Sequence, residues 1–154
     1  MRKAALVSLF CLCATAGLAT AASDQLTFRD AGFSIAPLEG SETLMMVLPA
    51  SDGFAASVNV QIQHYPGALD DYVSLSKEQF RQMGMKVLSE RKKGPSGWLV
   101  EYMGDMGGRS LHWYAHAELR KGKVYLATAT ATKRQWPSLS SKLKICIDSL
   151  TLTG

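Results

Sequence analysis

The alternation of apolar and polar residues is clearest at 55–65, AASVNVQIQHY, where polar side chains separate Val58, Val60 and Ile62. Because successive side chains of a β-strand point to opposite faces of a sheet, this pattern predicts a half-buried strand. Residues 109–119, RSLHWYAHAEL, alternate in the same way and predict a second strand with an apolar core face. The polar side of that strand carries Ser110, His112, Tyr114, His116 and Glu118.

After Pro66-Gly67 the spacing of apolar residues changes from two to three and four, which predicts an amphipathic helix over 69–83. Asp70 and Asp71 favour the N-terminal turn of a helix, and Gly84 suits the left-handed conformation that ends one. The stripe expected to be buried consists of Leu69, Tyr72, Val73, Ser76, Phe80 and Met83. The opposite side carries Asp71, Ser74, Lys77, Glu78 and Arg81.

Short apolar runs bounded by turn residues predict the remaining strands. They lie at 33–35, 43–48, 86–91, 97–105 and 123–132. The stretches RKKGPS, MGG and RKGK separate the last four predicted strands of the chain. They are short and contain glycine, as consecutive antiparallel hairpins require. The sequence therefore predicts a C-terminal four-strand meander.

A second helix is predicted after the meander, because Pro137 suits the first turn of a helix and apolar residues follow at helical spacing. Its buried stripe is predicted to consist of Trp136, Leu139, Leu143, Cys146 and Ile147. Asp148 and Ser149 are expected to end it, and 150–152 to add a short extended segment. The predicted fold class is α+β, with an antiparallel β-sheet of about six strands flanked by two main helices.

The first 21 residues have the pattern of a secretory signal peptide. A positive start precedes an uncharged apolar run over 4–18, and Ala19-Thr20-Ala21 offers the small side chains that signal peptidase requires. The run is shorter than the roughly 20 apolar residues that a membrane-spanning helix needs. We therefore expect cleavage after Ala21, a periplasmic or secreted location, no membrane span, and a single domain over 22–154.

Removal of that segment changes the composition in two ways. The formal net charge falls from +4 to +2, because Arg2 and Lys3 are lost and 15 basic residues remain against 13 acidic ones. This balance argues against nucleic-acid binding, which normally uses a pronounced basic patch. Of the three cysteines only Cys146 remains, so the processed chain can form no internal disulfide.

His112 and His116 invite interpretation as a metal site, but strand geometry argues against it. Four residues of a strand span about 13 Å, whereas two ligands of one zinc or copper ion lie about 4 Å apart at most. We therefore interpret the polar side of this strand as a candidate partner-binding face. The alternative is that a second helical layer covers it and its polar groups are hydrogen-bonded beneath that helix. The predicted face comprises Asn59, Gln61, Ser110, His112, Tyr114 and His116.

Basic residues occupy two of the predicted hairpin turns. Alternate turns of a meander lie at the same end of the sheet, so these residues should gather at one edge. Such an edge could attract an acidic protein or an anionic lipid headgroup, although basic turns also keep sheet edges soluble. This alternative edge comprises Arg91, Lys92, Lys93, Arg120, Lys121 and Lys123.

Catalytic signatures are absent from the sequence, which has no Cys-x-x-Cys pair, no phosphate-binding glycine loop and no Gly-x-Ser-x-Gly. We predict no catalytic, cofactor-binding or metal-binding residue. The methionines leave a copper carrier as an alternative, because thioether sulfur binds copper(I) outside the cytoplasm. Met45, Met46 and Met83 are predicted to fill the core instead, and Met106 to be exposed.

The order of elements and several short motifs resemble the PsbP-like superfamily. The motifs are Phe33-Ser34-Ile35-x-Pro37, Ser57-Val58-Asn59-Val60, Gly122-x-Val124-Tyr125-x-x-Thr128-Ala129-Thr130-Ala131 and Asp148-Ser149-Leu150. This superfamily includes extrinsic photosystem proteins, bacterial envelope proteins of the DcrB type and a nuclear-transport factor that binds the GTPase Ran. The resemblance implies an α-β-α sandwich whose members mostly bind or assist other proteins, and it carries over no functional residue.

These observations together predict an exported, non-catalytic accessory protein that binds another protein of the cell envelope. A periplasmic carrier of a small ligand or of copper is the alternative. An enzyme is the least favoured class, because no nucleophile, base and orienting group can be assembled from the sequence.

Overall fold

The computed structural model describes residues 25–153, which divide after Glu39 into two compact units. The first unit contains an antiparallel hairpin of β1 (Leu26–Phe28) and β2 (Phe33–Ile35), joined by the 3-10 turn η1 (Arg29–Ala31). The rings of Phe28 and Phe33 stack across the hairpin with centroids 4.8 Å apart. The predicted strand at 33–35 is confirmed, whereas β1 was not predicted. The signal peptide predicted for 1–21 lies outside the described residues, and the single domain over 22–154 stays a prediction.

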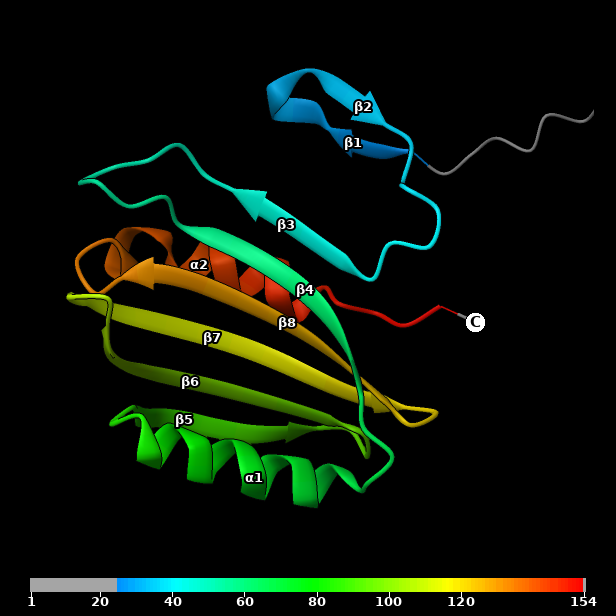
Figure 1. Ribbon diagram of the computed structural model, residues 1–154. Coiled ribbons are helices and arrows are strands. Elements are labelled where there is room, and N and C mark those ends of the chain that lie inside the picture. Colours follow the sequence, from blue (N-terminus) through cyan, green and yellow to red (C-terminus); the bar gives the residue numbers. More distant parts are fainter. Residues whose placement is uncertain (1–24, 154) are drawn as a thin grey trace, which may run out of the picture. The chain divides into compact units, whose positions relative to one another are not determined.

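The second unit is built on a six-stranded antiparallel sheet in the order β3-β4-β8-β7-β6-β5 (Figure 1). Its strands are β3 (Thr43–Val47), β4 (Ser57–His64), β5 (Lys86–Lys93), β6 (Gly97–Met106), β7 (Arg109–Arg120) and β8 (Lys123–Thr132). The last four strands pair with their neighbours in sequence, so the predicted meander is confirmed. The strand β4 then pairs with β8, which closes the gap between the meander and the earlier strands.

The helices α1 (Leu69–Gln82) and α2 (Trp136–Asp148) lie on opposite faces of this sheet (Figure 1). Alternation along β7 assigns its side chains to the two layers: Trp113 packs in the core beneath α1, and Tyr114 in the core beneath α2. The helix α2 lies over β4, β8 and β7, whereas α1 packs against β5 and β6 near one edge of the sheet. The α+β sandwich that the resemblance implied is therefore observed, with a helical layer that covers one face only in part.

The helices begin and end close to the local signals in the sequence that predicted their ends. Gly84 follows α1 with a φ of 67°, and Pro137 lies in the first turn of α2. Met83 was predicted on the buried stripe of the first helix, but 52% of its surface is exposed because α1 ends at Gln82. Residues 150–152 form no strand of the sheet, and their extended conformation stays a prediction.

Candidate functional site

The polar residues of β7 that the sequence offered as a binding face lie beneath α2. The exposed fractions are 8% for His112, 8% for Tyr114 and 1% for His116. His112 and Tyr114 have partners on β6 and α2, whereas His116 pairs with Glu118 of its own strand. A partner-binding face made of these three residues is therefore wrong, because the second helix occupies it.

Glu101 of β6 joins the sheet to α2 at one end of this row. Its Oε1 accepts hydrogen bonds from His112 Nε2 at 2.8 Å and from Trp136 Nε1 at 3.2 Å. Its Oε2 pairs with Lys144 Nζ at 2.7 Å. The His112 ring also stacks on the indole of Trp136, with centroids 4.0 Å apart. Burial alone raises the pKa of Glu101, but the hydrogen bonds from Lys144 and His112 outweigh it and hold that pKa below its ordinary value.

At the other end of the row, Asp148 and Glu118 are the hydrogen-bond partners of Tyr114 and His116. Tyr114 donates its hydroxyl proton to Asp148 Oδ1 at 2.9 Å, and burial together with this bond raises the pKa of Tyr114 to about 12. His116 Nε2 lies 3.1 Å from Glu118 Oε2, and Glu118 also accepts a hydrogen bond from Ser96. The Nδ1 atom of His116 has no partner that meets hydrogen-bond geometry, although the backbone of Ile147 is near enough to favour its protonation.

Both buried histidines are held in their neutral form. Burial lowers the pKa of His112, and hydrogen bonding to Glu101 offsets that effect only in part. Burial and the charge of Lys93 lower the pKa of His116, again against a smaller opposing effect of Glu118. A neutral imidazole that donates to a carboxylate satisfies both groups without an unpaired buried charge. The contacts of Glu101 and Tyr114 fasten α2 to the sheet, whereas the His116–Glu118 pair lies within β7.

Asn59 and Gln61 lie on the opposite face from the histidines. The register places Val58 beside Ala129 and Ala129 beside Tyr114, so the apolar side of β4 shares the α2 face. The predicted extension of the polar face through Asn59 and Gln61 is therefore wrong. The remaining member, Ser110, is exposed at the start of β7 and donates to Asp105 Oδ1 at 2.5 Å.

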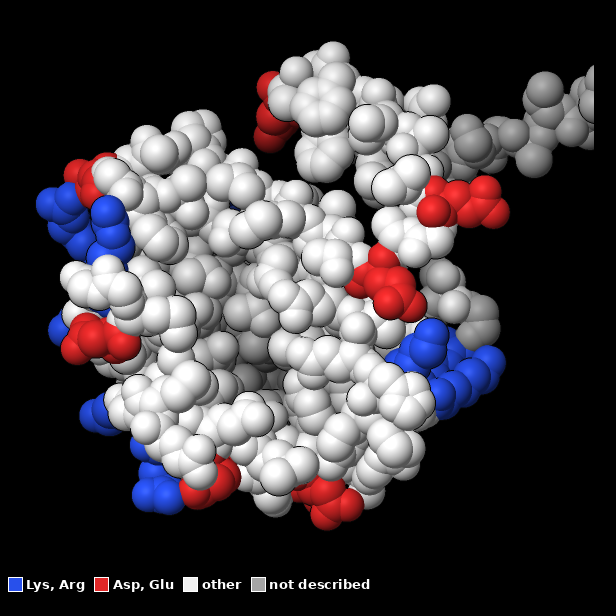
Figure 2. Space-filling model, in the orientation of Figure 1, with Lys and Arg blue, Asp and Glu red and all other residues white. Residues whose placement is uncertain are grey.

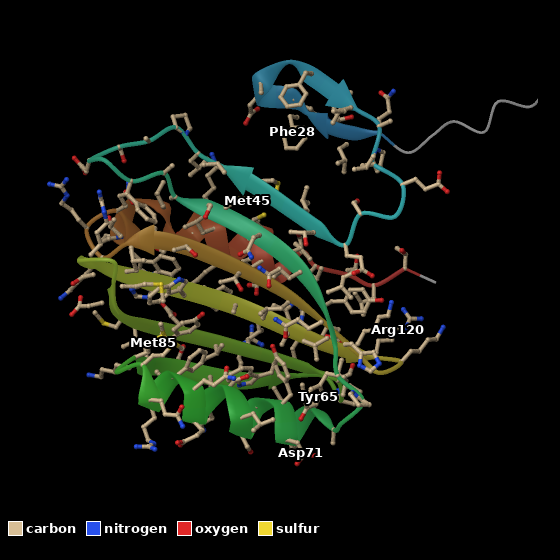
Figure 3. All side chains as sticks on the ribbon, viewed as in Figure 1. Phe28, Met45, Tyr65, Asp71, Met85 and Arg120 are labelled. Atoms are coloured by element: carbon tan, nitrogen blue, oxygen red, sulfur yellow. The ribbon has the colours of Figure 1, made fainter. Side chains whose placement is uncertain are left out.

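The partial cover that α1 gives to its face leaves a groove of about 350 Å³ between this helix and the sheet. We call it the α1 groove. The helix side consists of Tyr72, Leu75, Ser76, Gln79 and Phe80, and the sheet side of Gln63, Tyr65, Tyr102, Ala115 and Leu126. Tyr65 lies between α1 and the sheet (Figure 3) and meets the Tyr72 ring edge to face, with centroids 5.3 Å apart. The Tyr72 hydroxyl donates to Gln63 Oε1 at 3.0 Å.

No residue that lines the α1 groove carries a charge. Burial raises the pKa of Tyr72, and it raises that of Tyr102 to about 12, so both phenols stay protonated at neutral pH. Figure 2 shows this face of the sheet unit as a hollow surrounded by uncharged residues, with Lys, Arg, Asp and Glu towards the rim. Beyond the groove the uncharged surface continues over Gln61 of β4 and Met45 of β3, both exposed. The site can therefore contact apolar and amide groups but offers no charge to a ligand.

The strand order that creates the α1 groove could not be found from the sequence. A weak signal was available, because AASVNVQIQHY has a polar side of amides and hydroxyls with no charge. A polar side without charge suits a sheet surface that contacts another part of the protein or a partner as well as water. The aromatic residues of α1 were recognised only as a buried stripe.

The basic hairpins lie at one end of the sheet, because Lys93 pairs with Gly97, Gly97 with Glu118, and Arg120 with Lys123. Several of the basic side chains already bind within the chain. Lys92 pairs with Asp70 at 2.8 Å, and Lys93 donates to the Asp148 carbonyl at 2.9 Å. Arg120, labelled in Figure 3, donates to the carbonyl of Leu152 at 3.4 Å. Binding of an acidic protein or an anionic lipid by this edge stays a prediction.

Residues considered for metal chemistry are dispersed. Within 25–153, no three His, Cys, Asp or Glu side chains gather closely enough to hold a metal ion. Met45 was predicted to fill the core, but 65% of its surface is exposed because its side chain lies on the open face of an edge strand. Met46 packs against the core and Met106 is exposed, as predicted. Burial raises the pKa of the Cys146 thiol, which disfavours the reactive thiolate.

No protein-family model and no curated protein matches this chain. The fold is similar to that of a Pseudomonas aeruginosa protein of unknown function, provisionally described as a regulator. That match has 20% identity and a TM-score of 0.64, and it covers 85% of this chain and 97% of the other. At this identity the match shows a shared fold and nothing of function.

Two further matches come from groups that the sequence resemblance named. The PsbP protein of the cyanobacterium Synechocystis has 15% identity and a TM-score of 0.48, with 92% of this chain and 99% of that chain covered. The Ran-binding protein Mog1p of Saccharomyces cerevisiae has 9% identity and a TM-score of 0.41, with 57% and 56% covered. Both TM-scores are below 0.5, so neither match supports an argument about the family or the function of this chain.

Proposed function

We propose that this chain is a non-catalytic binding protein of the cell envelope, and that its α1 groove holds an uncharged, partly apolar segment of a partner protein. The observation that carries the proposal is the lining of the groove, which combines aromatic rings with the amides of Gln63 and Gln79 and contains no charge. Aromatic side chains give large contact area, and side-chain amides can form hydrogen bonds to a peptide backbone. An anionic or cationic ligand would lose its hydration there without gaining an opposite charge.

The non-catalytic part of the proposal is supported by where the titratable groups lie. Within the described residues, His112, His116 and Glu101 have shifted pKa values, but the two histidines are buried, Glu101 is partly buried, and each is bound to another side chain. The α1 groove lies on the other face and contains no group that titrates near neutral pH. Acid–base chemistry would need such a group within reach of a bound substrate.

The groove is tested by photo-crosslinking in living cells. A photoreactive phenylalanine analogue at Leu75, which is 56% exposed at the groove, should give a defined adduct with one envelope protein. The matched control places the same analogue at Ile145, an apolar residue of α2 that is 72% exposed and lies on the other face. We expect no adduct from Ile145.

A second change in the groove makes that test specific. Gln63→Glu keeps the oxygen that accepts the Tyr72 hydroxyl but adds a charge to the lining. Burial of that charge by a bound partner should reduce the Leu75 adduct about tenfold or more. Equal adducts from Leu75 and Ile145, or a Leu75 adduct that Gln63→Glu leaves unchanged, would contradict the use of this groove.

The proposed envelope location rests on the sequence of the first 21 residues. Protein expressed from the full chain should be recovered from the periplasmic fraction, and N-terminal sequencing should begin at Ala22. Recovery of an unprocessed chain from the cytoplasm would contradict export and an envelope partner, whereas a Leu75 adduct with another protein would still support the use of the groove. No helix within 25–153 is long and apolar enough to cross a membrane.

A carrier of a small uncharged molecule is the second candidate. The volume of the α1 groove, about 350 Å³, lies at the lower end of the range of about 300–1,000 Å³ that is usual for small-molecule sites. Native mass spectrometry of protein purified from the envelope distinguishes the two functions. A stoichiometric added mass that Gln63→Glu removes would favour the carrier over the protein partner.

A further inference from the structure

The two edges of the six-stranded sheet are protected to very different degrees. The edge strand β5, KVLSERKK, is rich in charge, has an irregularity in its pairing between Val87 and Ser89, and packs against α1. Charges, bulges and a covering helix are the usual means by which proteins prevent strands from adding to a sheet edge. The opposite edge strand β3, TLMMV, has no charge, no proline and an unbroken register with β4.

The backbone of β3 presents free hydrogen-bonding groups along this edge. Ile62 N–H donates to the Glu42 carbonyl, and Leu48 N–H donates to the Ala56 carbonyl, so the even-numbered residues of this segment bond to β4. Because backbone groups alternate in direction along a strand, Thr43, Met45 and Val47 direct their N–H and C=O groups away from β4. No strand within 25–153 pairs with that side.

We propose that two copies of this chain pair antiparallel through β3, with a two-fold axis at Met45. In this register Met45 lies opposite Met45 of the partner subunit, and Thr43 lies opposite Val47 of the partner subunit. Each of the three outward residues of one copy then exchanges two backbone hydrogen bonds with its opposite residue, which gives six in all. The two six-stranded sheets become one continuous sheet across the axis.

A second copy fits this edge because the strand is complementary to itself. The residues on either side of Met45 whose backbone groups also point away from β4 are Thr43 and Val47. Both are β-branched, and β-branched residues pair well across antiparallel strands. The side chains of Met45 and Val47 are 65% and 56% exposed, and the pairing would cover both. A two-fold axis places the same residue of two copies side by side, so a charge there would repel its own copy, but β3 carries no charge.

The dimer should be weak, because one five-residue strand buries less surface than the roughly 1,200 Å² of a stable interface. Sedimentation of the purified protein should show a monomer at about 1 µM and a dimer at several hundred micromolar, as expected for a Kd of about 10–100 µM. Met45→Pro removes an N–H that β4 does not use, so the folded monomer should remain and the dimer should disappear. Met45→Thr keeps that N–H and is the matched control.

Disulfide crosslinking tests the register without relying on proline. In a Cys146→Ala background, Met45→Cys should crosslink to itself on mild oxidation with oxidised glutathione, because opposite residues of such a pair lie about 5.5 Å apart at Cα. Val47→Cys alone should not crosslink, whereas a mixture of Val47→Cys and Thr43→Cys should.

Three results would overturn the proposal: a monomer at every concentration, a dimer that persists with Met45→Pro, or crosslinking of Val47→Cys to itself in preference to Met45→Cys. If β3 instead binds an extended peptide of another protein, the purified chain should remain a monomer at every concentration, which is the first of these results. The pairing leaves the α1 groove outside the interface, so Leu75 crosslinking and β3 dimerisation succeed or fail separately.

Discussion

The Glu101→Ala variant is expected to unfold at a Tm about 10 °C below that of the unchanged protein, through a loss of about 2–4 kcal/mol in the free energy of unfolding. Glu101 accepts from His112, Trp136 and Lys144 and is the point at which the end of α2 meets the sheet. Its removal leaves two buried ring N–H groups without an acceptor and a half-buried ammonium without its carboxylate. The penalty comes chiefly from these orphaned donors rather than from the lost attraction.

Glu78→Ala is the matched control. Glu78 also accepts hydrogen bonds from two side chains, Arg81 and Gln82, but it lies exposed on the outer side of α1. We expect no measurable change in its Tm, since solvent screens exposed pairs. Glu101→Gln should fall between the two, because it keeps an acceptor for His112 and Trp136 and loses the charge that Lys144 needs. Thermal unfolding followed by circular dichroism measures all three, and a Glu101→Ala Tm equal to that of Glu78→Ala would contradict a structural role for the network.

The secondary structure was predictable because its signals are local. The apolar spacing of α1, the alternation of β4 and β7 and the glycine-containing turns of the meander each depend on a few neighbouring residues. The short hairpin strand β1 was missed because three residues, LTF, are too few to show a period. Exposure at element ends was also misjudged, as at Met83, because periodicity does not show where packing stops.

The burial of the histidine row could not be predicted from its own strand. His112 and Tyr114 look solvent-exposed until their partners are known, and those partners lie on other elements, on β6 and α2. A hint is present in β6, where Glu101 interrupts the apolar run WLVEYM. A charge within such a run indicates a buried pair, and Lys144 of α2 supplies the opposite charge.

Assignment of the polar residues to one face or the other depends on register. A shift of one residue in the pairing of β4 with β8 would move Asn59 and Gln61 to the histidine side. No local pattern sets that register, because α1 and the strands β5, β6 and β7 separate β4 from β8 in the chain. The same long-range pairing positions the α1 groove, so the groove could not be predicted from the sequence either.

Stability towards denaturant should fall as the pH is lowered from 7 to 5, because the two buried histidines must take up protons. Burial lowers the pKa of His112 and of His116 below the ordinary value of 6.5 that each regains on unfolding. Between the folded and unfolded pKa values the unfolded chain binds more protons, so acid favours unfolding. The stability due to neutral histidine is therefore complete above about pH 6.5 and is lost as the pH falls through the folded pKa.

The double variant His112→Gln and His116→Gln should remove this dependence, because glutamine can donate an N–H to Glu101 and Glu118 and does not titrate. Its urea midpoint should stay level from pH 7 down to about 4.5, the ordinary pKa of a glutamate. Below that pH the midpoint should fall, since Glu101 has a lowered pKa in the folded state and acid protonates it preferentially in the unfolded chain. His64→Gln is the matched control, because His64 lies exposed at the end of β4 and its replacement should leave the fall between pH 7 and 5 unchanged. A double variant that loses stability over that range as steeply as the unchanged protein would show that other groups carry the acid sensitivity.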